Sequence, residues 1–280
     1  MEDLKEFGLP CLTHLDGPAN VHISFTGGKD SVLTLELIKT TMPNLTIKKL
    51  VTFFPITNTA HPNDFIAFQA EALGFPSEVN TISGDPSYLE TYRAHMKRFT
   101  EQDQVAALAT GDIEDVGHGF MGKAAYPTGL RILSPLFQRP REEILALFRK
   151  YQLKPVITLI SLGNIPHDIA VQLIGRVLDD TTLGIMRAHN VRVARGEVPQ
   201  GITAGKPNKH NNEVDLCGEN GEYHTMCLDG LSFKKRVCLV DVTTRKEIQG
   251  HEIPTIIKKD PWGEYLHLDY SSFGFELRDK

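Results

Sequence analysis

The first 160 residues alternate short runs of β-forming residues with longer amphipathic stretches, and this alternation constrains the fold more than any other feature. Residues 21–25 and 50–54 favour strands, whereas residues 30–39 and 64–73 carry apolar side chains at helical spacing. Strands separated by helices imply crossover connections and a mostly parallel sheet that is covered on both faces. The same alternation predicts further strands over 79–82, 105–110, 131–133 and 156–160 and further helices over 88–99 and 141–150.

The pattern changes beyond about residue 165. Residues 167–186 have helical periodicity, residues 189–212 are polar and irregular, and short β-rich runs follow. These runs predict strands over 225–228, 233–242 and 265–268. We therefore expect an α/β chain with a leader, a parallel-sheet domain and a smaller C-terminal α+β region. The expected bounds are 1–20 for the leader, 21–160 for the domain, 161–280 for the C-terminal region and 189–212 for a long loop within it.

Composition and charge exclude several classes of protein. The 280 residues are 41% hydrophobic and 23% charged, and no apolar run approaches the roughly 18–20 residues that a transmembrane helix needs. Residues 1–6 are acidic and do not predict a signal peptide. The net charge of −5 provides no overall attraction to nucleic acid. The four cysteines are scattered and favour free thiols, which are typical of the cytoplasm; they are Cys11, Cys217, Cys227 and Cys238. From these observations together we expect a cytoplasmic protein without a membrane or nucleic-acid partner.

The strongest chemical signal is the segment S-F-T-G-G-K-D-S at residues 24–31, between a predicted strand and a predicted helix. Paired glycines allow a tight turn, and the following helix adds free amides and the positive end of its dipole, which together form an anion site. Lys29 supplies a positive charge, and the hydroxyl groups of Thr26 and Ser31 supply donors. Asp30 is a candidate ligand for a magnesium ion that bridges phosphates.

Two other phosphate-binding loops do not fit this sequence. A Walker A loop requires glycine where Ile23 stands and serine or threonine where Asp30 stands. A G-x-G-x-x-G pattern occurs at residues 117–122, but it does not directly follow a predicted strand, and Pro127 interrupts the helix that it would open. We interpret that match as accidental or as a flexible flap.

Residues 24–31 instead resemble the loop S-G-G-x-D-S of the N-type ATP pyrophosphatases, the PP-loop superfamily, with Thr26 in place of the usual first serine. Two further segments narrow the resemblance. They are G-D-I at residues 111–113, followed by L-S-P-L-F and Arg139, and C-G-E-N-G-E-Y-H-T at residues 217–225, followed by L-D-G and F-K-K-R. In this order the three segments resemble the diphthine–ammonia ligase family and its relatives.

The resemblance extends from about Val21 to Arg236 and implies a HUP-like, Rossmann-like ATP pyrophosphatase domain. Enzymes of that family use ammonia to amidate the carboxylate of diphthine, a modified histidine on elongation factor 2, and release AMP and pyrophosphate. ATP would activate the acid as an acyl adenylate, while Lys29 and Mg²⁺ neutralise charge on the departing pyrophosphate. The implied cofactors are ATP and Mg²⁺, and the implied partners are ammonia and a carboxylate, either diphthine or a small molecule.

The resemblance also implies a set of site residues. The expected catalytic residues are Lys29, Asp30, Glu219 and Glu222, and Asp30 is the expected metal ligand. The two glutamates would bind ammonium or a cationic group of the substrate, or else satisfy backbone amides of a tight turn. The expected nucleotide-binding residues are Ser24, Thr26, Gly27, Gly28, Lys29, Asp30, Ser31, Thr52, Phe53, His61, Gly111 and Asp112. The expected substrate-binding residues are Asp112, Arg139, Glu219, Asn220, Gly221, Glu222 and Thr225.

The chain departs from the family at two places. Residues 117–128 are rich in glycine where family members carry a polar helical segment with arginine, and the loop at 189–212 resembles an insertion. Amidation of a small-molecule carboxylate by the same chemistry is therefore an alternative. Two further alternatives are a PP-loop enzyme that modifies tRNA and a nucleotide-binding regulator without turnover.

Overall fold

The computed structural model describes residues 12–55, 61–115, 117–198, 202–203, 206–207, 212–261 and 263–280. The chain divides into two compact units, Met1–Tyr151 and Gln152–Lys280. Residues 1–11 of the expected leader, including Cys11, lie outside the described residues, as do residues 199–201, 204–205 and 208–211 of the expected loop.

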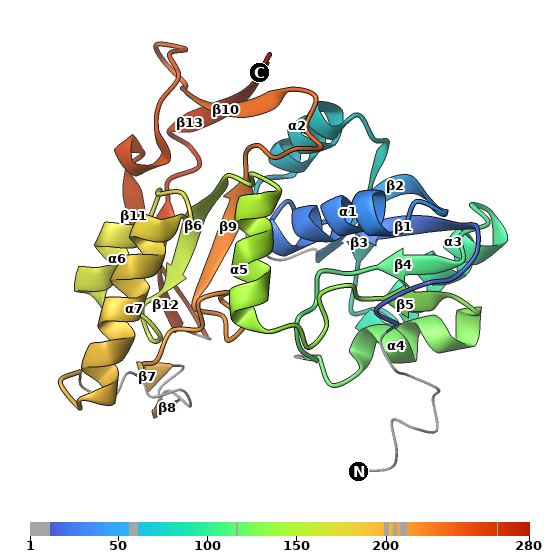
Figure 1. Cartoon of the computed structure of the whole chain (residues 1–280), viewed down its shortest axis with the longest axis horizontal. Helices are drawn as coiled ribbons and strands as arrows, with labels where there is room; N and C mark the ends of the chain where they lie inside the picture. Colours follow the sequence, from blue (N-terminus) through green and yellow to red (C-terminus); the bar gives the residue numbers. More distant parts are fainter. Residues whose placement is uncertain are drawn as a thin grey trace. The chain divides into compact units, whose positions relative to one another are not determined.

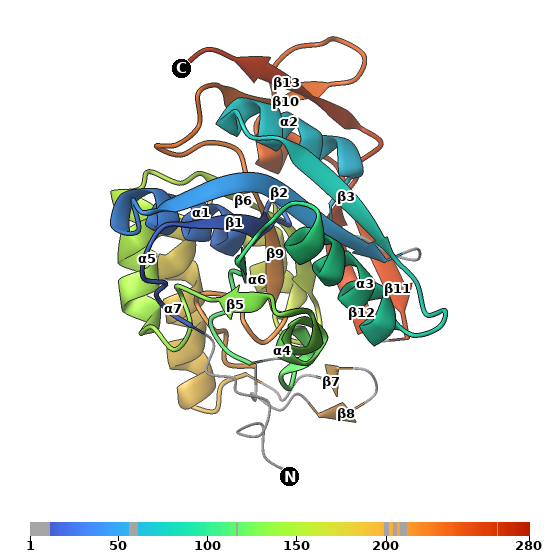
Figure 2. The ribbon, with the colours of Figure 1, turned by 90° about the vertical axis from the view of Figure 1, so that its right-hand side faces the viewer.

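The first unit is built around a five-stranded parallel sheet in the order β3-β2-β1-β4-β5 (Figures 1 and 2). Its strands are β1 (Ala19–Ser24), β2 (Leu45–Pro55), β3 (Ser77–Ile82), β4 (Ala107–Ala109) and β5 (Arg131–Leu133). Its helices are α1 (Lys29–Thr41), α2 (Asn63–Leu73), α3 (Tyr88–Glu101), α4 (Phe120–Ala125), the 3₁₀ helix η2 (Tyr126–Thr128) and α5 (Arg141–Lys150). Helices and a parallel sheet in alternation confirm the predicted α/β fold class.

Helices α3 and α4 pack against each other and join one face of this sheet through a buried apolar cluster. The cluster comprises Val51, Met96, Phe99, Val105, Leu108, Ala124, Ala125, Leu130 and Ile132. Helix α1 lies beside α5, and residues 31–38 of α1 are all buried. Because every face of α1 is covered over this stretch, its position relative to β1 is firmly held.

Local signals explain where several helices begin and end. Helix α3 begins after Ser87, whose hydroxyl group accepts a hydrogen bond from Glu90 N at 3.2 Å. Helix α2 ends at Gly74, which has φ of 74°, as its glycine predicts. No helix among the described residues is long and apolar enough to span a membrane.

The second unit contains a four-stranded sheet in the order β11-β12-β6-β9, all of whose neighbours are antiparallel. Two smaller pairs are β10 with β13 and β7 with β8 (Figure 1). The strands are β6 (Pro155–Ser161), β7 (Ile202–Thr203), β8 (Lys206–Pro207), β9 (Tyr223–Cys227), β10 (Arg236–Asp241), β11 (Thr255–Asp260), β12 (Gly263–Leu268) and β13 (Phe273–Arg278). The helices are α6 (His167–Leu173), α7 (Asp180–Ala194) and the 3₁₀ helix η3 (Gly250–Glu252).

Strand β6 corrects one expectation from the sequence. Residues 156–160 were expected to continue the parallel sheet of the nucleotide-binding domain, but β6 belongs to the second unit and runs antiparallel to β9 and β12. Its apolar run is compatible with any strand buried on both faces, so periodicity alone does not identify its neighbours. Strands β7, β8, β11 and β13 were not predicted.

The helix expected over residues 167–186 is also interrupted. Residues 174–179 leave the helix and pair with β6, with Gly175 N donating to Ile157 O at 2.8 Å and Ile157 N donating to Arg176 O at 2.9 Å. Asp179 then caps α7, which continues to Ala194 and occupies the first part of the expected loop. A glycine and a strong N-cap in mid-sequence account for the break.

Candidate functional site

The carboxyl ends of β1 and β4 meet where the order of the parallel sheet reverses. From β1 the chain moves outward through β2 and β3, and it then returns to place β4 on the other side of β1. Open parallel sheets bind ligands outside the strand ends at such a switch point. The loop at residues 25–28 follows β1, and residues 110–112 follow β4, so both segments lie at this point.

Gly27 forms the tight turn of the loop after β1. Its φ of 76° is a left-handed conformation that glycine adopts without strain. A Cβ at this position would lie 2.9 Å from Phe65 Cε1 and would overlap the side-chain amide of Gln69. The nitrogen Nε2 of Gln69 donates to Gly27 O at 2.9 Å. Helix α2, which carries Phe65 and Gln69, therefore closes directly over the turn.

Two further side chains bind the carbonyl oxygens of the same loop. Thr52 Oγ1 donates to Phe25 O at 2.7 Å, and His61 Nδ1 donates to Thr26 O at 3.1 Å. Together with Gly27 O, three consecutive carbonyl groups are thus bonded to protein side chains. An anion site needs its backbone acceptors engaged elsewhere, because carbonyl oxygens repel negative charge. The loop meets that requirement, and the side chain of Thr26 is exposed.

Helix α1 begins at the end of this loop. Gly28 is its N-cap residue, and within the described residues no side chain caps this end. Ser31 Oγ donates to Gly28 O at 3.0 Å. Lys29 is only 5% exposed, and its ammonium donates to Asp30 Oδ2 at 2.7 Å. The first turn therefore combines helix amides, which favour an anionic ligand, with a buried ammonium that is paired with Asp30.

Residues after β4 pack directly on this first turn. A Cβ at Gly111 would lie 2.8 Å from the carbonyl carbon of Asp30, so only glycine allows the close approach. Thr34 Oγ1 donates to Thr110 O at 3.3 Å and ties α1 to the same segment. Burial raises the pKa of Asp112 above its usual value; a hydrogen bond from Thr110 opposes this, and the charge of Asp30 adds to it. Two carboxyl groups thus share one electrostatic environment.

Phe53 and Arg139, two of the expected site residues, have structural contacts of their own. The ring of Phe53 lies 4.6 Å from that of Tyr92, within the apolar packing under α3. Arg139 Nε donates to Pro135 O at 2.7 Å, and its guanidinium also pairs with Glu143 in the first turn of α5. Phe53 contributes to the core, and Arg139 holds the segment between β5 and α5.

In the second unit Glu222 lies at the centre of a tight turn. It is 1% exposed, and its carboxylate accepts hydrogen bonds from Asp215 N at 2.8 Å, Asn220 N at 2.9 Å and Asn220 Nδ2 at 3.2 Å. Burial raises the pKa of Glu222, although these hydrogen bonds oppose the shift. The carboxylate of Glu222 therefore holds its own turn together by binding the backbone amides of Asp215 and Asn220.

The other expected substrate residues surround Glu222. Glu219 is half-buried, Asn220 is exposed, and Gly221 turns the chain with φ of 78°. Thr225 is buried in β9 opposite Ile157. The structure thus brings most of the expected residues of the first unit together around the start of α1, Phe53 and Arg139 apart, and those at 219–222 together in one turn of the second unit.

Three side chains around this site were not predicted from the sequence: Gln69 and Phe65, which lie against Gly27, and Thr34, which donates to Thr110 O. Phe65 and Gln69 are four residues apart, so helical spacing places them on one face of α2. Nothing in the sequence indicates that this face meets Gly27. The contact depends on the crossover that returns α2 to the end of β1.

The part of the chain that the structure describes contains no group of three or more His, Cys, Asp or Glu side chains arranged to hold a metal ion. Its described cysteines, Cys217, Cys227 and Cys238, are buried free thiols. A metal bound here would therefore need ligands from outside such a cluster, for example from a phosphorylated substrate.

Comparison with known proteins yields structural likeness only. No family model and no curated protein matches the chain. One similar solved structure is a predicted subunit of tRNA methyltransferase from Methanocaldococcus jannaschii, at 17% identity and TM-score 0.36, covering 48% of this chain and 75% of that one. Another is the U34-tRNA thiolase NcsA from Methanococcus maripaludis with its [4Fe-4S] cluster, at 17% identity and TM-score 0.34, covering 48% of this chain and 58% of that one. The function is therefore inferred from the site itself.

Proposed function

We propose that the first unit binds ATP at the loop between β1 and α1 and promotes attack of an acceptor oxygen on the α-phosphorus. The bond from that oxygen to phosphorus forms as the bond to the bridging oxygen breaks, and pyrophosphate leaves with the electron pair. The observation that carries the proposal is the loop at the switch point. Its consecutive carbonyl groups are bonded to protein side chains while the first turn of α1 begins at Gly28 with Lys29 buried beside it.

The residues at this point suit a triphosphate. Amides at the start of a helix and the ammonium of Lys29 would bind the β- and γ-phosphates and stabilise the departing pyrophosphate. Asp30 and Asp112, which influence each other electrostatically, would hold Mg²⁺ together with phosphate oxygens. That ion, when bound with ATP, neutralises negative charge on the phosphates. One or two carboxylates beside phosphate oxygens are the usual protein contribution to a magnesium site.

For the acceptor we propose a carboxylate that is coupled to ammonia. Its adenylate would then be attacked by ammonia at the acyl carbon, with loss of a proton from nitrogen and departure of AMP. Glu222 would act as a positioning residue for the turn that carries Glu219 and Asn220. The resemblance of residues 217–225 to the diphthine–ammonia ligases supports this acceptor.

The second candidate acceptor is tRNA. It shares the chemistry at the α-phosphorus, and it stands among the alternatives that the sequence leaves open. The residues around Gly27 and Lys29 serve both acceptors equally, since they concern the nucleotide only. A direct comparison of the two acceptors is therefore part of the test.

The experiment incubates the protein with ATP labelled at the α-phosphate, Mg²⁺ and ammonium, with either a panel of carboxylic acids or bulk tRNA. We expect labelled AMP, formed faster when an acid is present. Formation of ADP would contradict attack at the α-phosphorus. AMP formation stimulated by tRNA and by no acid would replace the carboxylate with the second candidate.

Matched lysine variants on helix α1 connect the activity to the loop. Lys29→Met is expected to lower the rate of AMP formation at least about 100-fold, because it removes a charge that stabilises the leaving group. Lys39→Met changes an exposed lysine in the last turn of the same helix and should leave the rate unchanged. Equal effects of the two substitutions would contradict the assigned role of Lys29.

A further inference from the structure

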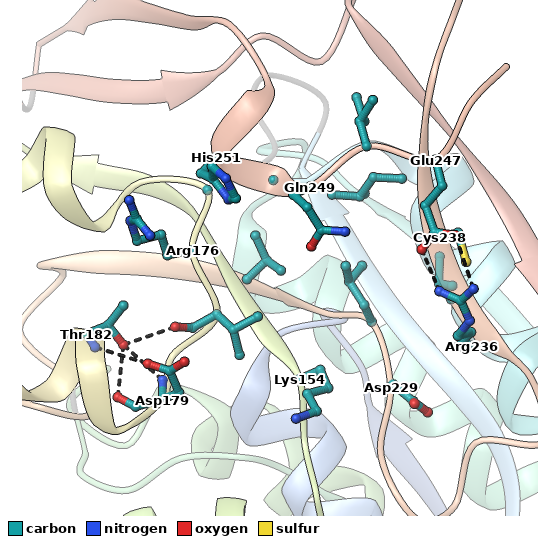
Figure 3. A pocket seen from close by; sticks show the side chains of 18 of the residues that line it. Lys154, Arg176, Asp179, Thr182, Asp229, Arg236, Cys238, Glu247, Gln249 and His251 are labelled. Carbon is teal, nitrogen blue, oxygen red and sulfur yellow. Dashed lines mark hydrogen bonds and ion pairs between the residues drawn. The ribbon is translucent and has the colours of Figure 1, made fainter. Parts of the chain in front are cut away.

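The second unit contains a cavity of about 440 Å³, a size typical of small-molecule sites (Figure 3). It lies at the end of β9 that leads into Leu228 and Asp229, and both residues line it. The turn with Glu219 and Glu222 precedes the opposite end of the same strand. The cavity is therefore separate from the substrate turn in the proposed function.

One wall of the cavity is built from two backbone segments in direct contact. A Cβ on either Gly175 or Gly250 would overlap the carbonyl oxygen of the other glycine. Main-chain hydrogen bonds hold the first segment to β6, including the one from Ile157 N to Arg176 O at 2.9 Å. Such a wall is formed before any ligand binds, which reduces the entropy lost on binding.

Part of the inner surface of the cavity is apolar. Val156, Val237 and Leu239 line it and are 3%, 3% and 2% exposed. They come from β6 and β10, so two separate strands contribute to the same surface. A ligand that buries an apolar or aromatic body against this surface gains binding free energy.

The acidic side chains of the cavity are all engaged by the protein. Asp179 accepts the backbone amides at the start of α7. Asp229 pairs with Lys280 at 2.8 Å. Glu247 receives both guanidinium nitrogens of Arg236, at 2.5 and 3.1 Å, as the dashed lines in Figure 3 mark. The charges of Asp229 and Glu247 are therefore compensated by cations, and that of Asp179 is stabilised by the start of α7.

Two basic side chains of the cavity are not engaged in this way. Lys154 and Arg176 are exposed, and neither side chain has a hydrogen-bond or ion-pair partner among the described residues. Their main chains are nevertheless fixed, since Lys154 N donates to Asp229 O at 3.0 Å. The cavity thus combines an apolar patch with two basic side chains at its edge that pair with no carboxylate among the described residues.

We propose that this cavity binds a small organic anion. Its apolar or aromatic body would lie against Val156, Val237 and Leu239, and its carboxylate or phosphate would pair with Lys154 and Arg176. A planar guanidinium suits either anion through two parallel hydrogen bonds. This site goes beyond the nucleotide chemistry of the first unit and does not depend on it.

The test is a ligand-observed NMR titration of the full chain with four probes of known structure. Phenylacetate combines an aromatic body with a carboxylate, and phenyl phosphate replaces the carboxylate with phosphate. Phenylacetamide keeps the body without the charge, and acetate keeps the charge without the body. We expect saturable binding of phenylacetate or phenyl phosphate that is at least about fivefold tighter than binding of the last two probes. The tighter of the two anions identifies the anionic group.

Substitutions then locate the binding. Arg176→Gln and Lys154→Gln are each expected to weaken the tighter anion about threefold to tenfold, whereas Lys258→Gln, an exposed lysine on β11 outside the cavity, should have no effect. Val177→Trp should abolish binding of every probe by filling the cavity. If that variant does not fold, the two charge variants decide the outcome, because both positions are exposed.

Three results would overturn the inference: no saturable binding of either aromatic anion, equal binding of phenylacetamide and phenylacetate, or anion binding that survives both charge substitutions unchanged. Lys29→Met separates this site from the proposed function. It should lower the rate of AMP formation at least about 100-fold and leave anion binding in the second unit intact.

Discussion

The side-chain amide of Gln69 donates to the carbonyl oxygen of Gly27 at 2.9 Å and so connects helix α2 to the turn that follows β1. Gln69 is fully buried, and Gly27 has a left-handed backbone conformation. This polar contact between residues 42 positions apart therefore helps to fix the loop, together with the bonds from Thr52 and His61.

Replacing Gln69 with leucine should remove the hydrogen bond to the loop without leaving a cavity at position 69. The leucine is of similar size but leaves the Gly27 carbonyl without its donor. We expect a loss of about 1–2 kcal/mol in the free energy of unfolding and about tenfold weaker ATP binding. Chemical denaturation and calorimetric titration with ATP would measure the two effects. Gln102→Leu, at an exposed position after α3, is the control and should change neither quantity.

Gly27→Ala should weaken ATP binding more than Gly129→Ala, although both glycines have φ near 75°. The backbone strain of about 1 kcal/mol is common to both. A Cβ at Gly129 has no atom within 4 Å, whereas one at Gly27 meets Phe65 at 2.9 Å. Gly129→Ala should therefore retain ATP binding, and Gly27→Ala should lose it. Similar ATP affinities for the two variants, measured by titration, would refute the close packing of α2 on the loop.

Acid should destabilise the protein through His22. This buried histidine donates from Nε2 to Asp103 Oδ2 at 2.9 Å, and burial lowers its pKa more strongly than Asp103 raises it. Below about pH 6.5 the unfolded chain binds a proton that native His22 does not. The free energy of unfolding should therefore fall as the pH decreases from 7 toward 5, by at most about 1.4 kcal/mol per pH unit from this group.

The carboxyl group of Asp103, beside His22, extends the loss of stability to lower pH. The pKa of Asp103 is lowered, since hydrogen bonds and charges from His22 and Lys49 outweigh burial, so its contribution is lost below about pH 4. Urea denaturation at several pH values should show a shallower dependence between pH 7 and 5 in His22→Gln. His14→Gln, at an exposed histidine, should retain the dependence of the unmodified protein. Identical slopes for all three proteins would remove His22 from the explanation.

Glutamine at Glu222 should destabilise the second unit more than glutamine at Glu219. An amide at position 222 places a donor against the backbone amides of Asp215 or Asn220, which now bind a carboxylate. We expect a loss of about 2 kcal/mol for Glu222→Gln and less than about 1 kcal/mol for Glu219→Gln, both measured by denaturation. A larger loss for Glu219→Gln would contradict the positioning role of Glu222.

Much of the first unit could be predicted from local pattern. Strand β5 and helix α5 match their predicted bounds, 131–133 and 141–150, and most other strands and helices differ by a few residues at their ends. Apolar periodicity and turn residues act within short stretches of chain, so they predict secondary structure without a tertiary structure. The glycine-rich segment at 24–31 could likewise be picked out, because paired glycines followed by lysine between a strand and a helix are typical of anion-binding loops.

The sequence by itself determined the alternation of strands and helices and the glycines that the turns require, and it predicts an anion site at residues 24–31. Only the tertiary structure decided that β6 joins an antiparallel sheet, that α2 closes over Gly27, and that the carboxylate of Glu222 is used by its own turn. Each of these depends on which donor meets which acceptor after the chain has folded. Short-range periodicity records the burial of a residue, whereas hydrogen-bond partners distant in sequence are set by the packing of whole elements.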